Sequence, residues 1–191
     1  MTVAFSTSSP VASVAVIAAD GSVLWEGARA SGHQAGGVCL EMLEQARSTL
    51  GFAWDDVSLF AADMGPGSFT GTRVGVILAK TLAFLGDRPV VGASSFDLID
   101  PSGTVVLPNK RNEYFVRLAG QEPIRTPELP SGPFMGFGPG IESEVYPSAS
   151  SFSLLPGLNP QSAISFVPEY LVDPSISIPK KPYVLQEAKG A

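Results

Sequence analysis

Residues 65 to 71 read GPGSFTG, and this glycine-rich stretch joins an apolar run to a segment with the spacing of a helix. A loop before a helix can bind a phosphate, because its backbone N–H groups point at the anion. A P-loop also needs a lysine and a hydroxyl residue directly after its last glycine, but Thr72 and Arg73 follow Gly71 here and the next lysine is Lys80. The Rossmann spacing fails as well, since the third glycine comes one residue late, so the loop matches neither nucleotide-binding pattern.

A structural role explains this loop better than nucleotide binding does. Gly65 and Gly67 allow positive φ angles, and Pro66 fixes the turn. Ser68 or Thr70 then caps the helix that follows, although the free N–H groups at the helix start remain available to an anion. We predict a structural loop made of Gly65, Pro66, Gly67, Ser68, Phe69, Thr70 and Gly71.

The other residues with catalytic potential stand alone in the sequence. His33 is the single histidine, so a metalloprotease site with two histidines cannot form. Cys39 falls on the apolar side of a predicted helix, where a cysteine is usually part of the core. Asp63 ends an apolar strand, but a two-metal nuclease needs further carboxylates, and the first strand offers Ser6 instead. We therefore predict no catalytic residue, no metal ligand and no cofactor-binding residue.

The composition indicates a globular protein that does not bind nucleic acid by itself. Hydrophobic residues make up 45% of the 191 residues, and the longest apolar runs are too short to span a bilayer. The formal net charge is −6, and the basic residues do not cluster as counterion release would require. A single cysteine allows no internal disulfide, and no signal peptide is visible, so we expect a cytoplasmic protein.

The prolines divide the chain into two parts, because fourteen of the seventeen follow Asp100. We predict an N-terminal lobe over 1–100 and a reduced C-terminal lobe, rich in strands and loops, over 101–191. The first lobe is predicted to have strands at 2–8, 11–19, 22–29, 58–64 and 88–94 and helices at 34–50 and 71–85. This order, βββαβαβ, is typical of actin-like (ribonuclease H-like) α/β domains. Further strands are predicted at 104–110, 112–120, 134–138 and 162–167.

Both predicted helices carry apolar residues on a defined side. In the first helix these are Cys39, Leu40, Leu43, Ala46 and Leu50. In the second helix the side expected to face the sheet carries Val74, Leu78, Leu82 and Leu85, and the opposite side carries Arg73, Val76, Ile77, Lys80 and Phe84. Three apolar residues on an outward side have two explanations that stay open: the chain's own second lobe covers them, or a partner protein does.

The string AADMGPGSFTGTRVGVILAKTLA, residues 61–83, resembles the signature of the TsaB (YeaZ) family. Three other segments are similar in the same order along the chain: AFSTSSPVASVAV at 4–16, ASSFDLI at 93–99 and PEYLV at 168–172. The chain departs from the family pattern at the end of the first strand, where Ser6 takes the place of an aspartate. Val172 replaces the arginine of the C-terminal motif, and the segment around Glu113 matches only loosely.

The resemblance implies a non-catalytic partner subunit that works with the enzyme TsaD in making tRNA N6-threonylcarbamoyladenosine (t6A). TsaB proteins resemble TsaD in fold and pair with it, or with themselves as homodimers, through the two long helices of the first lobe. The implied interface residues here are Arg73, Val76, Ile77, Lys80 and Phe84, with His33 at the start of the first helix. A TsaE-like ATPase completes the complex in many bacteria, and tRNA would be reached only through that complex.

The alternative is an ATP-dependent kinase or phosphotransferase of actin-like fold that acts on a small metabolite. In actin-like ATPases the aspartate on the first strand helps to organise magnesium and phosphate. Ser6 carries no charge for that task, so the sequence favours the partner subunit.

Overall fold

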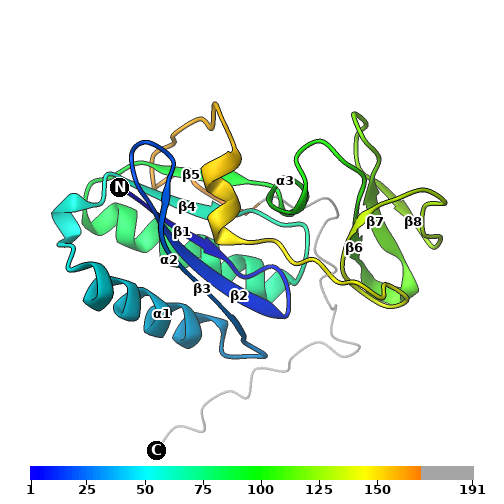
Figure 1. Ribbon diagram of the computed structural model, residues 1–191, viewed down its shortest axis with the longest axis horizontal. Coiled ribbons are helices and arrows are strands. Elements are labelled where there is room, and N and C mark those ends of the chain that lie inside the picture. The colour runs from blue at the N-terminus through cyan, green and yellow to red at the C-terminus, as the bar shows by residue number, and fades with distance from the viewer. Residues whose placement is uncertain (169–191) are drawn as a thin grey trace, which may run out of the picture.

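Five strands from the first half of the chain form one mixed sheet, in the order β3-β2-β1-β4-β5 (Figure 1). They are β1 (Thr2–Ser6), β2 (Val11–Ile17), β3 (Val23–Ala30), β4 (Leu59–Asp63) and β5 (Val90–Ala93). The computed structural model describes residues 1–168 of the chain. The first three strands pair antiparallel, while β4 runs parallel to β1 and β5 parallel to β4. The carboxyl ends of β1 and β4 therefore meet at the same edge of the sheet.

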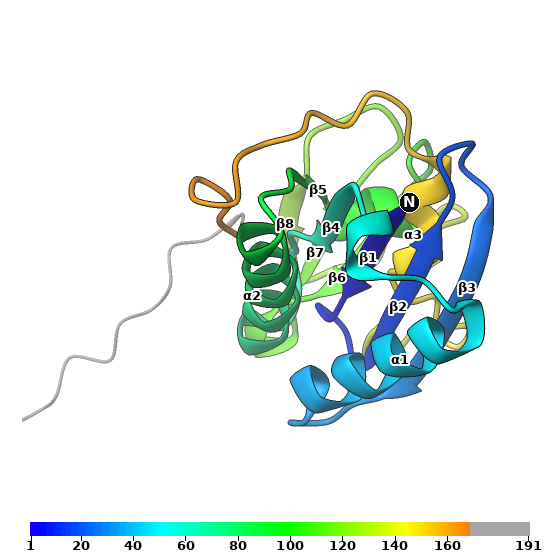
Figure 2. The same cartoon turned by 90° about the vertical axis from the view of Figure 1, so that its left-hand side faces the viewer.

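Two long helices lie on one face of this sheet, α1 (Ala35–Leu50) and α2 (Phe69–Leu85) (Figure 2). Both end where the sequence predicts: Gly51 adopts a left-handed conformation with φ of 69°, and Gly86 follows the last residue of α2. The short 3₁₀ helix η3 (Ala149–Leu154) packs on the opposite face, where Phe152 is buried in a separate apolar cluster. A segment from the second half of the chain thus completes the core of the first sheet.

A second sheet of four short strands follows, in the order β8-β7-β6-β9. Its strands are β6 (Val105–Pro108), β7 (Tyr114–Arg117), β8 (Ile124–Thr126) and β9 (Met135–Gly136). The strands predicted at 104–110 and 112–120 are confirmed and pair antiparallel as β6 and β7, and β9 lies within the strand predicted at 134–138. The short helices are α3 (Ser95–Ile99), η1 (Trp54–Asp56) and η2 (Lys110–Asn112). The protein is therefore a mixed α/β molecule with two mixed sheets and few helices.

The strand predicted at 162–167 is wrong. Gln161 makes a single antiparallel bridge to Val90 at the edge of β5, and the chain then turns. Ala163 and Phe166 are buried in the core on the helical side of the first sheet, whereas Ile164 and Val167 are exposed, so the segment packs as a turn and not as a strand. The motif at 168–172, including Val172, lies beyond the described residues except for its first proline. Among the described residues no helix is long and apolar enough to cross a membrane.

The buried side of α1 differs in part from the prediction. Cys39, Leu43 and Ala46 are buried as expected, but Leu40 and Leu50 are exposed. Met42 fills the core in their place, since it belongs to the stripe with a spacing of three and four residues that faces the sheet. Burial raises the pKa of the Cys39 thiol to about 12, which suits a cysteine that serves only packing.

The predicted sides of α2 are also shifted, and Val76 is the residue for which this matters. Its side chain is 1% exposed and belongs to the core, so the prediction that Val76 lies on the outward side is wrong. The helix turns its smallest residues inward because it approaches the end of β1 very closely: a Cβ on Gly75 would lie 2.5 Å from the Thr7 hydroxyl oxygen. Val76 follows Gly75 into the core, while Leu85, predicted to face the sheet, is exposed.

Candidate functional site

A buried carboxylate lies where β1 and β4 end. The Ser6 and Ser8 hydroxyls donate hydrogen bonds to Oδ2 of Asp63, over 2.7 Å and 2.5 Å. The Ser95 hydroxyl and the Gly65 N–H donate to Oδ1, over 2.6 Å and 2.9 Å. The parallel pairing of β1 with β4 brings the first three side chains together, and Ser95 comes from the first turn of α3. The cluster joins both strand ends, the glycine-rich loop and α3.

Burial dominates the electrostatics of this cluster. Asp63 is buried, and loss of solvation raises the pKa of its carboxyl above the usual range. The three hydroxyls and the Gly65 N–H act in the opposite direction, because they stabilise the ionised form. In the part of the chain that the structure describes, three serine hydroxyl groups therefore surround the Asp63 carboxyl.

Ser8 and Ser95 belong to this cluster although neither was predicted from the sequence. Ser8 comes two residues after β1, and Ser95 opens the short helix after β5. Both positions follow strands of the same sheet, which is the signal that could have placed them near Asp63. Within residues 1–168, no three histidine, cysteine, aspartate or glutamate side chains gather in a way that could hold a metal ion.

The glycine-rich loop has the structural features expected of it, with one correction. Gly65 has φ of 90°, as predicted, but Gly67 does not adopt positive φ. Gly67 is needed for space instead: a Cβ there would lie 2.3 Å from the carbonyl oxygen of Ser8. Ser68, of the two candidate residues, caps α2, since its hydroxyl accepts the N–H of Gly71 over 3.1 Å.

Two clefts border the loop on its side towards the second sheet. The larger, of about 770 Å³, is lined by residues that include His33, Ser68, Phe69, Lys110 and Glu144. His33 is exposed just before α1, as predicted, and it lines this cleft together with the start of α2 and residues of the second sheet.

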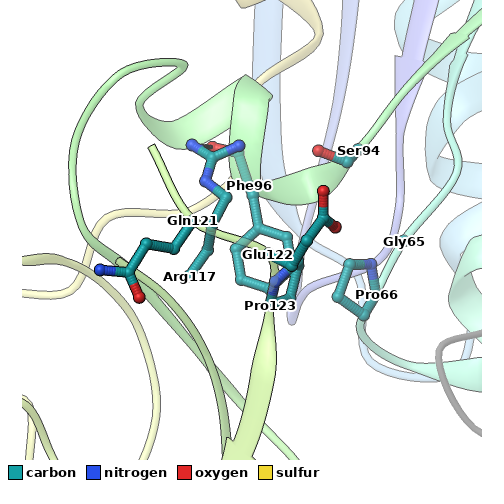
Figure 3. Close-up of a pocket in the computed structure, with 8 residues that line it drawn as sticks. All are labelled: Gly65, Pro66, Ser94, Phe96, Arg117, Gln121, Glu122 and Pro123. Atoms are coloured by element: carbon teal, nitrogen blue, oxygen red, sulfur yellow. Dashed lines mark hydrogen bonds between the residues drawn. The ribbon is translucent and has the colours of Figure 1, made fainter. Parts of the chain in front are cut away.

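The smaller cleft, of about 310 Å³, lies between the loop, α3 and the strand β7 (Figure 3). Arg117 provides its positive charge, and the guanidinium lies over the ring of Phe96, 5.4 Å from its centroid. The same guanidinium forms an ion pair with Asp97 and donates to the backbone carbonyl of Asp100. These groups already bind Arg117, so its positive charge is engaged within the chain.

The outward side of α2 keeps most of the predicted interface residues. Ile77 is 58% and Phe84 64% exposed, both high values for large apolar side chains. Arg73 stacks on the ring of Phe69 at 4.0 Å. Lys80 lies between Ile77 and Phe84 along the helix and donates from Nζ to two backbone carbonyls of the segment after Gln161, each over 3.0 Å. Of the residues predicted for this side of α2, only Val76 lies elsewhere.

Comparisons with known proteins agree with this fold. Two solved structures superpose with TM-scores of 0.71 and 0.73 at 21% and 20% identity, covering 89% and 90% of this chain and 99% of theirs. The first is YeaZ from Pseudomonas aeruginosa, and the second is a protein described as similar to peptidase YeaZ from the same organism. The family model described as TsaD, tRNA N6-adenosine threonylcarbamoyltransferase, matches residues 32–106.

Sequence relatives carry the name tRNA threonylcarbamoyladenosine biosynthesis protein TsaB. Those of Bacillus subtilis and Escherichia coli are 46% identical over 48 residues and 38% over 56 residues, which is 25% and 29% of this chain. That of Haemophilus influenzae is 32% identical over 96 residues, or 46% of this chain. The aligned segments span only 21%, 24% and 41% of the three relatives' own lengths.

The two sheets, the glycine-rich loop and the paired helices define an α/β protein with the fold of YeaZ. The resemblance read from the sequence is confirmed: the chain is a homologue of the TsaB (YeaZ) proteins, which are named for t6A biosynthesis.

Proposed function

We propose that this chain is a non-catalytic partner subunit that binds a TsaD-like enzyme and supports the t6A modification of tRNA. The carrying observation is the outward side of α2, where Ile77 and Phe84 stay exposed although the helix is packed on the sheet. Complete burial of both side chains would contribute about 1–2 kcal/mol each before the cost of association. Such a surface is suited to pairing with another apolar helix.

The expected partner should contain helices equivalent to α1 and α2. The TsaD family model matches residues 32–106, a range that contains all of α1, β4, α2 and β5. A TsaD-like protein should therefore carry its own version of the two helices, and helix can pack against helix across the interface. The same surface would join two copies of this chain when no partner is present. A TsaE-like ATPase and tRNA would join through the complex.

The proposal includes an actin-like fold for residues 1–100 and a reduced second lobe after them. Supporting this, the order β1, β2, β3, α1, β4, α2, β5 and the sheet order β3-β2-β1-β4-β5 are those expected of an actin-like lobe. The proposed second lobe, 101–191, sends residues 149–166 back to the first sheet, which ties the lobes together.

A serine in place of an acid at the end of β1 supports a non-catalytic role. Ser6 stands where an actin-like ATPase has an acid, and its hydroxyl is bonded to Asp63. A neutral hydroxyl held in this way supplies no negative charge for magnesium. The glycine-rich loop would then serve to set the direction of α2.

Replacing Ile77 by Glu tests the proposal, because it places a charge in the apolar patch. We expect this variant to lose co-purification with a TsaD-like protein and to abolish t6A formation, while its thermal midpoint stays within about 2 °C. Ile124→Glu is the matched control, since Ile124 is similarly exposed but lies on β8 of the second sheet. Normal pairing by the Ile77 variant would refute the assigned surface.

A kinase or phosphotransferase remains the second candidate, favoured by the 770 Å³ cleft beside the start of α2 and by Lys110 at its edge. We expect calorimetry with Mg-ATP to detect no binding at micromolar concentrations. Magnesium-dependent micromolar binding would favour the kinase over the partner subunit.

A further inference from the structure

Lys80 of α2 forms hydrogen bonds to the backbone of a distant segment of its own chain. Its Nζ donates to the carbonyl oxygens of Ile164 and Phe166, each over 3.0 Å. The same segment has two further anchors: Gln161 exchanges both backbone hydrogen bonds with Val90 at the edge of β5, and the Phe166 ring is buried in the core. The segment is thereby held by β5 at Gln161, by Lys80 of α2 at Ile164 and Phe166, and by the core at the Phe166 ring.

Anchoring this segment leaves two of its apolar side chains outside. Ile164 is 73% exposed, and Val167 is exposed as well. Lys80 binds the carbonyl of Ile164 itself and that of Phe166, the residue before Val167. Lys80 in turn lies one helical turn from Ile77 and one from Phe84. Figure 2 shows the segment, coloured orange, running beside one end of α2. The apolar surface therefore does not end at the helix.

We infer that the partner-binding surface of α2 continues onto residues 161–167, and that Lys80 is a positioning residue that holds this extension in place. This inference rests on the proposed function, because the occupant is the same TsaD-like partner. Lys80 then serves its own chain and not the partner, since two of its three N–H donors already bind carbonyls of residues 164 and 166.

The chemistry of the extension fits an apolar helix better than a charged ligand. The described part of the surface offers Ile77, Phe84, Ile164 and Val167, and no acidic side chain lies among these positions. Two carbonyl oxygens already solvate the Lys80 ammonium group, so fewer of its hydrogen bonds to water have to be lost when a partner helix covers the patch. In an interface, contacts around the central side chains exclude water from them, and Ile164 and Val167 would do this for Ile77 and Phe84.

Substitution of Ile164 by Asp tests the extension directly. We expect the dissociation constant for the TsaD-like protein, measured by calorimetry with the full chain, to rise at least tenfold. Leu154→Asp is the matched control: Leu154 is 72% exposed, against 73% for Ile164, but belongs to η3 on the opposite face of the sheet. We expect it to change the constant less than twofold. Equal effects of the two variants would overturn the inference.

The positioning role of Lys80 needs a readout that a simple contact would not move. Lys80→Met removes the ammonium group and both of its hydrogen bonds while keeping most of the apolar part of the side chain. We expect weaker binding together with faster amide hydrogen exchange at Gln161 and Ser165 in the free chain, and unchanged exchange in the middle of α2. Lys80→Arg, which can still donate twice, should restore most of both properties. Weaker binding with unchanged exchange would show that Lys80 contacts the partner, against this inference.

The outcomes separate this inference from the proposed function. If the unmodified chain did not bind the TsaD-like protein, the proposed function would fail, and the extension with it. If Ile77→Glu abolished binding while Ile164→Asp behaved like the control, the proposed function would stand and only the extension would be refuted.

Discussion

Replacing Gly67 tests why the loop needs a glycine, because the structure indicates that the reason is space and not a positive φ. Its φ is not positive, so alanine is compatible with the backbone conformation itself. The added Cβ would nevertheless lie 2.3 Å from the carbonyl oxygen of Ser8 and 2.9 Å from the Ser8 Cβ. A carbon and a carbonyl oxygen in contact normally lie about 3.3 Å apart or more, so the loop and the end of β1 must separate by about 1 Å.

The expected loss of stability follows from two terms. Overpacking against backbone atoms typically destabilises a protein by about 1–3 kcal/mol. The same Ser8 carbonyl accepts the N–H of Ser68 over 2.7 Å, and moving it weakens a hydrogen bond worth about 1 kcal/mol. We therefore expect Gly67→Ala to lower the free energy of unfolding by about 2–4 kcal/mol, and the thermal midpoint by about 5–15 °C.

Urea unfolding followed by circular dichroism measures this change, and Gly37→Ala is its control. Gly37 lies in α1 with no atom within 4 Å of an added Cβ. Alanine is favoured over glycine in helices, so this variant should gain about 0.5–1 kcal/mol. Opposite signs for two identical substitutions would establish that close approach decides the loop position. A Gly67 variant within 0.5 kcal/mol of the unmodified protein would refute the steric reasoning.

Two further predictions concern buried residues. Val76→Ala should destabilise the protein by about 2–3 kcal/mol in urea unfolding, because it leaves a cavity in the core, whereas Ile77→Ala should change stability by less than about 0.5 kcal/mol; similar values would place Val76 outside the core. The pKa of the Asp63 carboxyl is raised on folding, so the folded protein keeps this proton at pH values where the unfolded chain, with a pKa of 3.8, has lost it. The stability that the bound proton contributes is therefore complete below pH 3.8 and falls as the pH rises through the raised pKa of the folded protein. Asp63→Asn has no proton to lose and should lack this fall in a series of urea titrations from pH 4 to 8, so parallel profiles for the two proteins would contradict the assignment.

Most of the candidate site could be read from the sequence only as separate parts. The loop and its cap at Ser68 were predictable, because turn and capping preferences are local. The serine cluster around Asp63 was not, since Ser6 and Ser95 lie 57 and 32 residues away from it along the chain. Parallel pairing of β1 with β4 brings them together, and no local pattern specifies that register.

The sequence by itself determined the first sheet's strands, the ends of both long helices and the resemblance to TsaB proteins. These depend on periodicity, on glycine at helix ends and on one long motif, all of which act over a few residues. The tertiary structure alone decided the exact rotation of α2 about its axis, which buries Val76 and exposes Leu85, and where residues 161–167 go. Helical periodicity defines sides but not their orientation. The orientation was set by the close approach at Gly75, which turned Val76 into the core, and by the burial of Phe166, which brought the segment to Lys80.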